Sequence, residues 1–228
     1  MIKRLLDMVL SLALLVLFSP VLAAAGLLVA LDSPGPVIHR GRRVGKDGRV
    51  FPLFKFRTMV QGAEGMGPAV TVGDDVRVTR IGGFLRRWKL DELPQFYNVL
   101  RGEMSLVGPR PEAPRYVGLY TAEERRVLSI RPGVTGISQI FFRDEESLLR
   151  REDAERFYID FLMREKLRLD LAYVKHHSVA IDLGLLGITL VAIVRPAAGA
   201  ALAERFARAV WGIEMPRRSP SAAAPFPA

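Results

Sequence analysis

The stretch MVLSLALLVLFSPVLAAAGLLVAL occupies residues 8–31 and contains no charged side chain. A straight helix of this length reaches about 36 Å, enough to cross a hydrocarbon core of about 30 Å. Lys3 and Arg4 provide a basic start, and Ala23–Ala25 resembles a signal-peptide cleavage site. The stretch therefore predicts one of three structures: a cleaved signal peptide, a spanning helix, or a helix that enters the membrane and returns.

A helix-breaking pair, Ser19 and Pro20, lies near the middle of this stretch. Proline removes a backbone hydrogen bond and clashes with the preceding turn, so we expect a bend there, and Ser19 can bond the disturbed backbone. Both flanks are basic, because residues 32–57 contain seven Lys or Arg against Asp32 and Asp47. Basic flanks favour the cytoplasmic face, and a bent re-entrant helix places both there. A kinked spanning helix is the alternative, and on this segment alone the two stay open.

The composition narrows the class of protein. The chain has 228 residues, a formal net charge of +9, 50% hydrophobic residues and no cysteine. Without cysteine, a disulfide scaffold, a Cys-ligated zinc site, an iron–sulfur cluster and a thiol nucleophile are excluded. A basic, apolar-rich chain predicts an anionic partner: nucleic acid, an acidic membrane surface or a phosphorylated ligand. The apolar N-terminus and the absence of clustered DNA-reading motifs predict no nucleic-acid partner.

The rest of the chain predicts a compact, mainly α-helical domain with a small β-hairpin. Asp47–Gly48 is a hairpin turn signal, and Thr121 with Glu124 fits a capping box that opens a helix. The expected strands are 37–40 and 50–56, followed by a mobile loop over 61–75. The expected helices are 81–90, 94–102, 147–171 with charges on its outer face, 179–194 as a buried or interfacial helix, and an amphipathic 197–211. The tail from Pro216 is expected to be disordered.

Adjacent carboxylates, Asp91 and Glu92, lie in the most informative segment, residues 79–112. The basic residues near them in sequence are Arg80, Arg86, Arg87, Lys89, Arg101 and Arg110. A carboxylate at a helix N-terminus is stabilised as the anion, which favours a nucleophile or metal ligand over a proton donor. Paired carboxylates and arginines predict a site for Mg²⁺ and a diphosphate. The ordinary alternative is that Asp-Glu before a proline simply begins a helix.

Five stretches of the chain resemble, in order, the signature of the bacterial sugar transferases, which are monotopic phosphoglycosyl transferases that use polyprenyl phosphate. They are KFRTM (55–59), LDELPQ (90–95), NVLRG (98–102), SLVGPRP (105–111) and RPGVTG (131–136). The Ser19–Pro20 break also resembles the re-entrant membrane helix of this family. The similarity runs from about residue 3 to about residue 194 and covers the catalytic core that larger members carry.

The resemblance implies a mainly α fold with a small β-hairpin, held in one leaflet at the cytoplasmic face of the bacterial plasma membrane. Residues 1–34 would form the re-entrant helix, 35–196 the catalytic domain with interfacial helices, and 197–228 an amphipathic helix and tail. Because cleavage near Ala25 would discard this anchor, the resemblance removes the signal-peptide alternative. It leaves a homodimer open.

The resemblance also implies a reaction. A sugar-1-phosphate passes from a UDP-sugar to polyprenyl phosphate with release of UMP, as the first membrane step of a glycan or exopolysaccharide pathway. Asp91 matches the family nucleophile, which forms a covalent phosphosugar intermediate, and Glu92, with Asp91, would hold Mg²⁺. The implied phosphate-binding residues are Arg86, Arg110, Arg131, Lys55 and Arg57.

Two other functions stay in view. A membrane-bound glycosyltransferase would move the sugar alone and release UDP, but the chain lacks the Asp-x-Asp signature of many such enzymes. The second alternative function is a non-catalytic basic module that binds anionic lipid.

The chain departs from the family after Gly136, where residues 137–144 read ISQIFFRD in place of a Trp-Ala-Gln run followed by Asn-Gly-Arg. The identity of the sugar therefore stays open.

Overall fold

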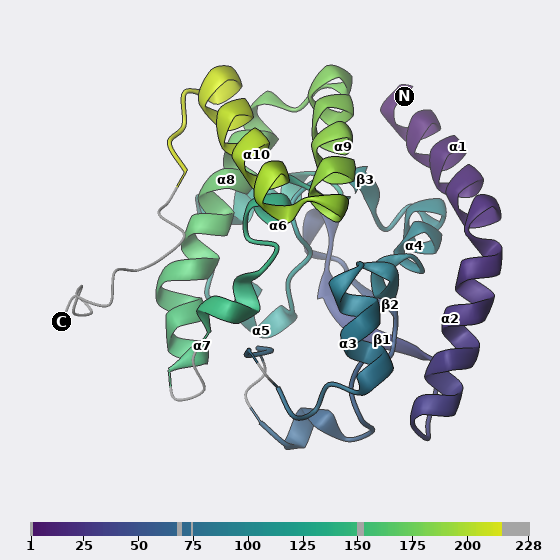
Figure 1. Cartoon of the computed structure of the whole chain (residues 1–228). Coiled ribbons are helices and arrows are strands. Elements are labelled where there is room, and N and C mark those ends of the chain that lie inside the picture. The colour runs from purple at the N-terminus through teal and green to yellow at the C-terminus, as the bar shows by residue number, and fades with distance from the viewer. Residues whose placement is uncertain (1, 68–69, 74, 150–152, 216–228) are drawn as a thin grey trace.

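The computed structural model describes residues 2–67, 70–73, 75–149 and 153–215. The tail expected to be disordered from Pro216 lies outside these residues. Helices dominate the part of the chain that is described, together with two separate two-stranded sheets. Figure 1 shows the first two helices along one side of the molecule and the last two helices at the top.

The apolar N-terminal stretch forms two helices, α1 (Ile2–Leu17) and α2 (Ser19–Asp32), which bend by 62°. The predicted break at Ser19 and Pro20 is confirmed, since Pro20 lies in the first turn of α2 and Ser19 Oγ donates to the Val16 carbonyl at 2.8 Å. Among the described residues, no single helix is long and apolar enough to cross a bilayer, whereas α1 and α2 together meet that length and composition.

Polar side chains attach α1 to the rest of the molecule. Asp7 is buried and accepts hydrogen bonds from Ser105 Oγ at 2.8 Å and from the Leu106 N–H at 3.1 Å, both in strand β3 (Ser105–Val107). Arg4 donates to the Val99 and Leu100 carbonyls at 2.7 and 3.1 Å, at the end of α4 (Gln95–Arg101). The apolar side chains of α1 therefore face outward, while its few polar groups face the protein.

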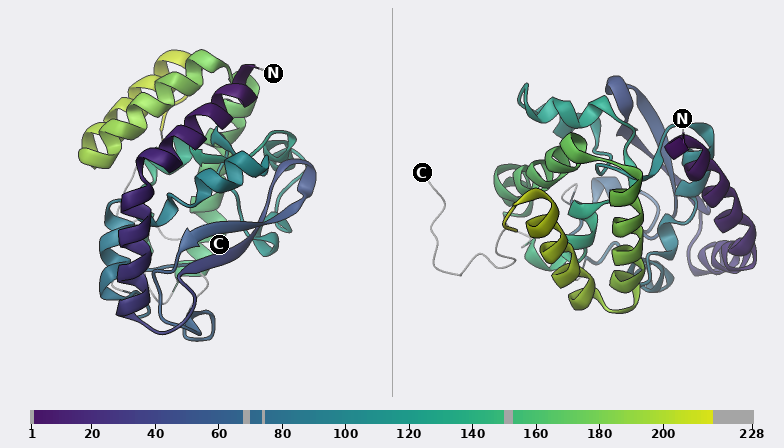
Figure 2. Two further views of the ribbon diagram at one scale, coloured as in Figure 1. Left: turned by 90° about the vertical axis from the view of Figure 1, so that its right-hand side faces the viewer. Right: turned by 90° about the horizontal axis from the view of Figure 1, so that it is seen from above.

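The predicted hairpin is present and longer than expected. Strand β1 (Ile38–Val44) pairs antiparallel with β2 (Val50–Phe56) over the whole length of both strands. The turn places Asp47 at φ 57° and Gly48 at φ 77°, a conformation that Asp and Gly adopt more readily than most residues. Figure 2 shows the hairpin extending across the molecule from the base of α2. The second sheet, β3 with β4 (Gly133–Thr135), is parallel and was not predicted.

Helix α3 (Arg80–Arg87) begins at Thr79, whose Oγ1 accepts from the Gly82 N–H at 2.9 Å. It ends earlier than predicted because Lys89 adopts φ 57°. The 3-10 turn Leu90–Glu92 (η3) then leads to α4, which ends at Gly102 with φ 84°, as predicted. A small core of α2, α3 and β2 side chains holds these elements together: Ala25, Val29, Phe56 and Leu85.

The segment predicted as a mobile loop packs into the protein where it is described. Val70 and Val72 join the main core, and the short 3-10 turn Ala63–Gly65 (η2) lies within the segment. Asp75 receives two hydrogen bonds from the buried guanidinium of Arg77, at 2.8 and 2.6 Å, and this contact lowers the pKa of Asp75 to about 2. The weak hydrophobic pattern of the segment concealed this buried ion pair.

The second half of the chain contains α5 (Pro114–Val117), η4 (Glu124–Ser129), α6 (Ile137–Phe141) and η5 (Glu145–Leu148). The predicted capping box is confirmed: the Thr121 N–H donates to Glu124 Oε2 at 2.7 Å, and the Glu124 N–H donates to Thr121 Oγ1 at 3.2 Å. It opens a 3-10 helix instead of an α-helix.

The predicted helix over 147–171 was wrong at both ends. The α-helical part begins with α7 (Ala154–Phe157), passes through a π-helical turn (Tyr158–Leu162) and continues as α8 (Met163–His176). The charges were also misplaced in part, because Lys166 and Asp170 are buried.

The last two helices, α9 (Val179–Val194) and α10 (Pro196–Trp211), pack against each other. Their bounds were predicted to within one residue. They approach closely at one point, where a Cβ on Gly199 would lie 2.3 Å from Ala192 Cβ. Figure 2 shows the two helices side by side, seen from above. Leu183, Leu190 and Val194 on α9 remain exposed, in addition to the apolar side chains of α1 and α2.

Candidate active site

Asp91 and Glu92 lie in η3, between α3 and α4. The positive φ of Lys89 turns the chain after α3 and starts the 3-10 turn that carries both carboxylates. Asp91 is only 6% exposed, and its Oδ1 has no hydrogen-bond partner among the described residues. Glu92 is more open, with 19% of its side chain exposed. The pair therefore combines a desolvated carboxylate with an accessible one.

The environment of Asp91 differs from the sequence expectation. Burial raises the pKa of the Asp91 carboxyl, and the neighbouring charge of Glu92 raises it further. Three cations oppose this change without reversing it: Lys55, Lys89 and Arg86. The expectation that a helix N-terminus would stabilise the anion was wrong, because α4 begins only at Gln95 and desolvation by burial is the largest effect on the Asp91 carboxyl.

Lys55 extends from β2 into the region of the Asp91 carboxylate. Burial lowers the pKa of Lys55 to about 8, and the charge of Arg86 lowers it further, while the charge of Asp91 acts in the opposite direction. A lysine with this pKa changes its charge near neutral pH. The hairpin therefore supplies a titratable cation to the carboxylate pair.

Arg86 extends from α3 and is held in place by two contacts. Its Nε donates to Thr58 Oγ1 at 2.9 Å, and its Nη1 pairs with Glu146 Oε1 at 2.9 Å. Thr58 belongs to the KFRTM stretch, so α3 and the end of the hairpin position this guanidinium together. The structure thus brings Lys55, Arg86 and the Asp91–Glu92 pair into one neighbourhood.

Arg110, in the loop after β3, completes the cationic side of the site. Its Nη1 lies 3.9 Å from Glu92 Oε1, and its backbone N–H donates to Asp170 Oδ2 at 3.2 Å. Burial alone would lower the pKa of Arg110. The pKa is nevertheless raised, because three carboxylates surround the guanidinium: Glu92, Glu145 and Glu112.

Several charged residues around Arg110 were missed by the sequence analysis. Lys166 of α8 pairs with Glu145, and Tyr158 donates a hydrogen bond to Glu112. Burial raises the pKa of Asp170 to about 7, although the N–H of Arg110 opposes this. The helical spacing of apolar residues in the sequence could have identified these buried positions. In α8, positions 166 and 170 lie on the same helix face as the buried residues at 163, 167 and 173, so they face the core and not solvent.

Two of the predicted phosphate-binding residues have other contacts. Arg57 is buried and donates through Nη2 to the Ser33 carbonyl at 2.5 Å and to Ser33 Oγ at 3.1 Å, which holds the end of α2. Arg131 donates through Nε to the Gly102 carbonyl at 2.8 Å. Gly102 ends α4, whereas the carboxylate pair precedes its first turn, so Arg131 lies at the far end of this helix.

The motif that contains Arg131 has a structural role in the described fold. A Cβ on Gly133 would lie 2.1 Å from the Gly108 N, so the RPGVTG and SLVGPRP stretches pack backbone against backbone. This contact allows the β3–β4 pairing and positions the loop that carries Arg110. Glycine is required at both positions by the close approach.

The Asp91 and Glu92 carboxylates are suited to holding Mg²⁺. No group of three or more His, Asp or Glu side chains suited to a metal ion occurs among the described residues. Mg²⁺ commonly uses only one or two carboxylates, completed by substrate phosphates and water. The unpartnered Asp91 oxygen and the open Glu92 carboxylate fit this requirement.

Comparisons with known proteins identify relatives. The family model described as Bacterial sugar transferase matches residues 1–196. The chain is 38% identical over 186 residues to the UDP-N-acetylgalactosamine-undecaprenyl-phosphate N-acetylgalactosaminephosphotransferase of Aeromonas hydrophila, covering 79% of this chain and 41% of that protein. It is 39% identical over 194 residues to the UDP-glucose:undecaprenyl-phosphate glucose-1-phosphate transferase of Escherichia coli (strain K12), covering 83% and 39%.

The chain thus spans about two fifths of the length of these two relatives. It is also 35% identical over 189 residues to a shorter protein, the uncharacterized sugar transferase EpsL of Bacillus subtilis (strain 168), covering 83% of this chain and 85% of that protein. The family match includes the bent helix pair, the hairpin, and the loops that carry Asp91, Glu92 and Arg110. The chain belongs to the bacterial sugar transferase family.

Proposed function

We propose that this enzyme transfers a sugar-1-phosphate from a UDP-sugar to polyprenyl phosphate and releases UMP, with Asp91 as the nucleophile. The observation that carries the proposal is the buried Asp91 carboxylate, whose Oδ1 has no partner among the described residues. The relatives are named for sugar-phosphate transfer to undecaprenyl phosphate from UDP-glucose or UDP-N-acetylgalactosamine, which supports the same class of reaction here.

In the first step, one oxygen of the Asp91 carboxylate attacks the phosphorus that carries the sugar, which leaves the other oxygen for Mg²⁺. A new oxygen–phosphorus bond forms, the bond from that phosphorus to the bridging oxygen breaks, and UMP leaves with the bond's electron pair. A buried, poorly hydrated carboxylate is a stronger nucleophile than an exposed one, because no water shell needs to be removed. Lys55, Arg86 and Arg110 offset the repulsion between this anion and the diphosphate.

In the second step, an oxygen of polyprenyl phosphate attacks the same phosphorus. The bond to Asp91 breaks, the carboxylate is restored, and a polyprenyl-diphosphate-sugar is released. Two displacements by oxygen nucleophiles thus replace one direct displacement between two phosphorylated substrates. The sugar phosphate stays on the enzyme between them, so water needs to be excluded from Asp91, and its burial favours this.

Glu92, with Asp91, would hold Mg²⁺. The ion, when bound, neutralises charge on the diphosphate and on the departing UMP. Arg110 lies near Glu92 and would keep that carboxylate oriented toward the phosphates.

The membrane placement follows from the acceptor, whose phosphate lies at the headgroup level. The α1–α2 pair would enter one leaflet and return, with Lys3 and Arg4 before it and the basic hairpin after it on the cytoplasmic face. A UDP-sugar from the cytoplasm and a lipid phosphate would then meet at the same surface.

Cysteine labelling tests this topology cleanly, because the chain contains no cysteine. We expect Ile2→Cys and Pro36→Cys to react with a membrane-impermeant maleimide from the same, cytoplasmic side of the membrane. A Phe18→Cys variant at the bend is the control and is expected to stay unlabelled in intact membranes. Labelling of positions 2 and 36 from opposite sides would show a spanning helix.

The pH dependence of turnover reports on Asp91 and Lys55. Asp91 attacks as the anion and has a raised pKa, so activity is expected to fall on the acidic side at a pH above the usual carboxyl range. Lys55 is cationic below its pKa of about 8, so activity is expected to fall again as the pH rises through that value. Lys55→Arg keeps the positive charge and is expected to extend activity to higher pH. A profile that Lys55→Arg leaves unchanged would contradict this role.

Analysis of the released nucleotide tests the function directly. Purified enzyme, Mg²⁺ and polyprenyl phosphate are combined with UDP-glucose, UDP-N-acetylgalactosamine and other UDP-sugars. UMP release that depends on the lipid would support the proposal and name the sugar. Release of UDP would show transfer of the sugar alone, and the proposed mechanism would be wrong.

A further inference from the structure

We propose that the protein has a second anion site, distinct from the Asp91–Glu92 pair, that binds the phosphate headgroup of an anionic phospholipid. This site, the N-terminal basic pocket, is a cavity of about 200 Å³ beside the start of α1. Its charged and titratable lining residues are Lys3, Arg4, Lys46, Arg131, His177 and Asp7. The proposal rests on the membrane placement of α1 and α2 given above.

The pocket has an excess of positive charge that the protein does not neutralise. Asp7 is the one carboxylate among the described lining residues, and both of its oxygens already accept hydrogen bonds, from Ser105 Oγ and the Leu106 N–H. Within the described residues, Lys46 and Arg131 make no ion pair. A phosphate could therefore accept from both without displacing an existing partner.

Backbone contacts hold two of the cations close together. Arg4 donates to the Val99 and Leu100 carbonyls, and Arg131 donates to the Gly102 carbonyl, so both guanidinium groups gather at the C-terminal end of α4. Burial lowers the pKa of Arg4, and the charge of Arg131 lowers it further. Like charges held together in this way favour a bound anion, because the anion relieves their repulsion.

The pocket is separated from the proposed catalytic centre by the length of α4. The Asp91–Glu92 pair precedes the first turn of that helix, whereas Arg4 and Arg131 contact its last carbonyls. Asp91 and Glu92 do not line the pocket. The anion bound here is therefore not the phosphate that reacts with Asp91.

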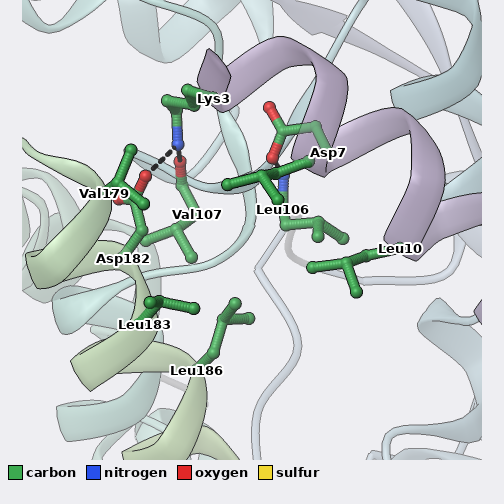
Figure 3. Close-up of a pocket in the computed structure, with 10 residues that line it drawn as sticks. Lys3, Asp7, Leu10, Leu106, Val107, Val179, Asp182, Leu183 and Leu186 are labelled. Atoms are coloured by element: carbon green, nitrogen blue, oxygen red, sulfur yellow. Dashed lines mark hydrogen bonds and ion pairs between the residues drawn. The ribbon is translucent and has the colours of Figure 1, made fainter.

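An adjoining apolar depression indicates that the anion belongs to a lipid. This depression lies between α1 and α9 and is walled by Leu6, Leu10, Leu183 and Leu186. It shares Lys3 and Asp7 with the N-terminal basic pocket. Figure 3 shows Lys3 at its upper edge, hydrogen-bonded to Asp182 and the Val107 carbonyl, with Leu10, Leu183 and Leu186 below. A cationic pocket beside an apolar surface matches a phosphate headgroup with its attached chain.

The experiment measures lipid retention by the 228-residue chain in detergent with native mass spectrometry. Phosphatidylglycerol, phosphatidylcholine and inorganic phosphate are titrated in separate arms. We expect preferential retention of phosphatidylglycerol, with an affinity about tenfold weaker in Arg131→Gln, as expected for loss of one charge-assisted hydrogen bond. The affinity should be weaker still in Lys46→Glu, because this variant also repels the phosphate. Arg49→Glu is the matched control, since Arg49 is exposed at the same hairpin turn but does not line the pocket.

The variants distinguish lipid binding in this pocket from non-specific attraction of lipid to a basic surface and from binding at the Asp91–Glu92 pair. Equal weakening by Arg49→Glu, or no weakening by Lys46→Glu and Arg131→Gln, would overturn the proposal. Phosphate binding with the same sensitivity to the variants, but without lipid retention, would overturn the assignment to a lipid. Asp91→Asn is expected to retain the lipid fully. The readout requires no turnover, so it stands apart from the nucleotide assay.

Discussion

Replacing Asp91 with Asn is expected to lower the rate of UMP release by about 10⁴-fold or more, because an amide does not perform the first displacement. The measurement is steady-state UMP formation with saturating UDP-sugar and polyprenyl phosphate. Intact mass analysis without the lipid acceptor adds a second readout. We expect a sugar-phosphate adduct on the wild-type chain and none on Asp91→Asn.

The same substitution is expected to leave the fold intact. Asn has nearly the shape of Asp, and Asp91 has a raised pKa, so its ionisation disfavours the folded state. A group with a higher pKa in the folded state makes stability fall as the pH rises through that pKa. At neutral pH the variant should therefore melt at the same temperature as the wild type or higher. Asp160→Asn is the control, because Asp160 is exposed on the π-helical turn Tyr158–Leu162. This variant should keep full activity.

Two results would contradict the role of Asp91. Substantial UMP release by the Asn variant would show that another group is the nucleophile. A melting temperature well below that of the wild type would show that the loss of activity came from unfolding, and Asp91 would then have a structural role.

Replacing Arg110 with Gln is expected to lower kcat/KM for the UDP-sugar by about 10²- to 10³-fold, the usual cost of removing one preorganised charged donor. Arg110 lies 3.9 Å from Glu92 and is surrounded by carboxylates that its positive charge balances. Without it, Glu92 and Glu145 would repel a bound diphosphate. Arg110→Lys keeps the positive charge but loses the planar guanidinium, which can donate two hydrogen bonds to one phosphate at the same time. This variant should therefore retain an intermediate activity.

The measurement separates KM from kcat across the UDP-sugar concentration range. Arg125→Gln removes one exposed arginine that makes no ion pair among the described residues and is the matched control, with activity expected to be unchanged. Melting temperatures of all three variants check the fold. An equal loss of kcat/KM in Arg110→Lys and Arg110→Gln would show that the fork geometry matters more than the charge. Unchanged kcat/KM in both variants would place Arg110 outside the reaction.

Features set by neighbouring residues were predicted well. The capping box of Thr121 and Glu124, the end of α4 at Gly102 and the break at Ser19 and Pro20 all depend on contacts within one helical turn. Helix α9 was predicted with its observed bounds because a long apolar run defines both ends. In each case the deciding interaction lies within about four residues in the chain.

Features set by distant residues were predicted poorly. Arg57 lies in a signature motif, but that motif gave no sign that its guanidinium also donates to Ser33 at the end of α2. The helix expected over 147–171 was predicted to carry its charges on the outer face, yet Lys166 and Asp170 are buried beside the loop that carries Arg110. The short β3–β4 pair was missed because three-residue strands have no detectable periodicity.

The amino-acid sequence by itself determined the family, the bend in the apolar N-terminal stretch and the position of the Asp91–Glu92 pair, because motifs and helix signals depend on residue types at short spacing. Only the tertiary structure decided what surrounds Asp91 and which arginines reach the pair. Burial raises the pKa of Asp91, where the sequence predicted a stabilised anion. Desolvation and charge depend on segments far apart in the chain, such as β2, α3 and the loop after β3, and only folding brings these together.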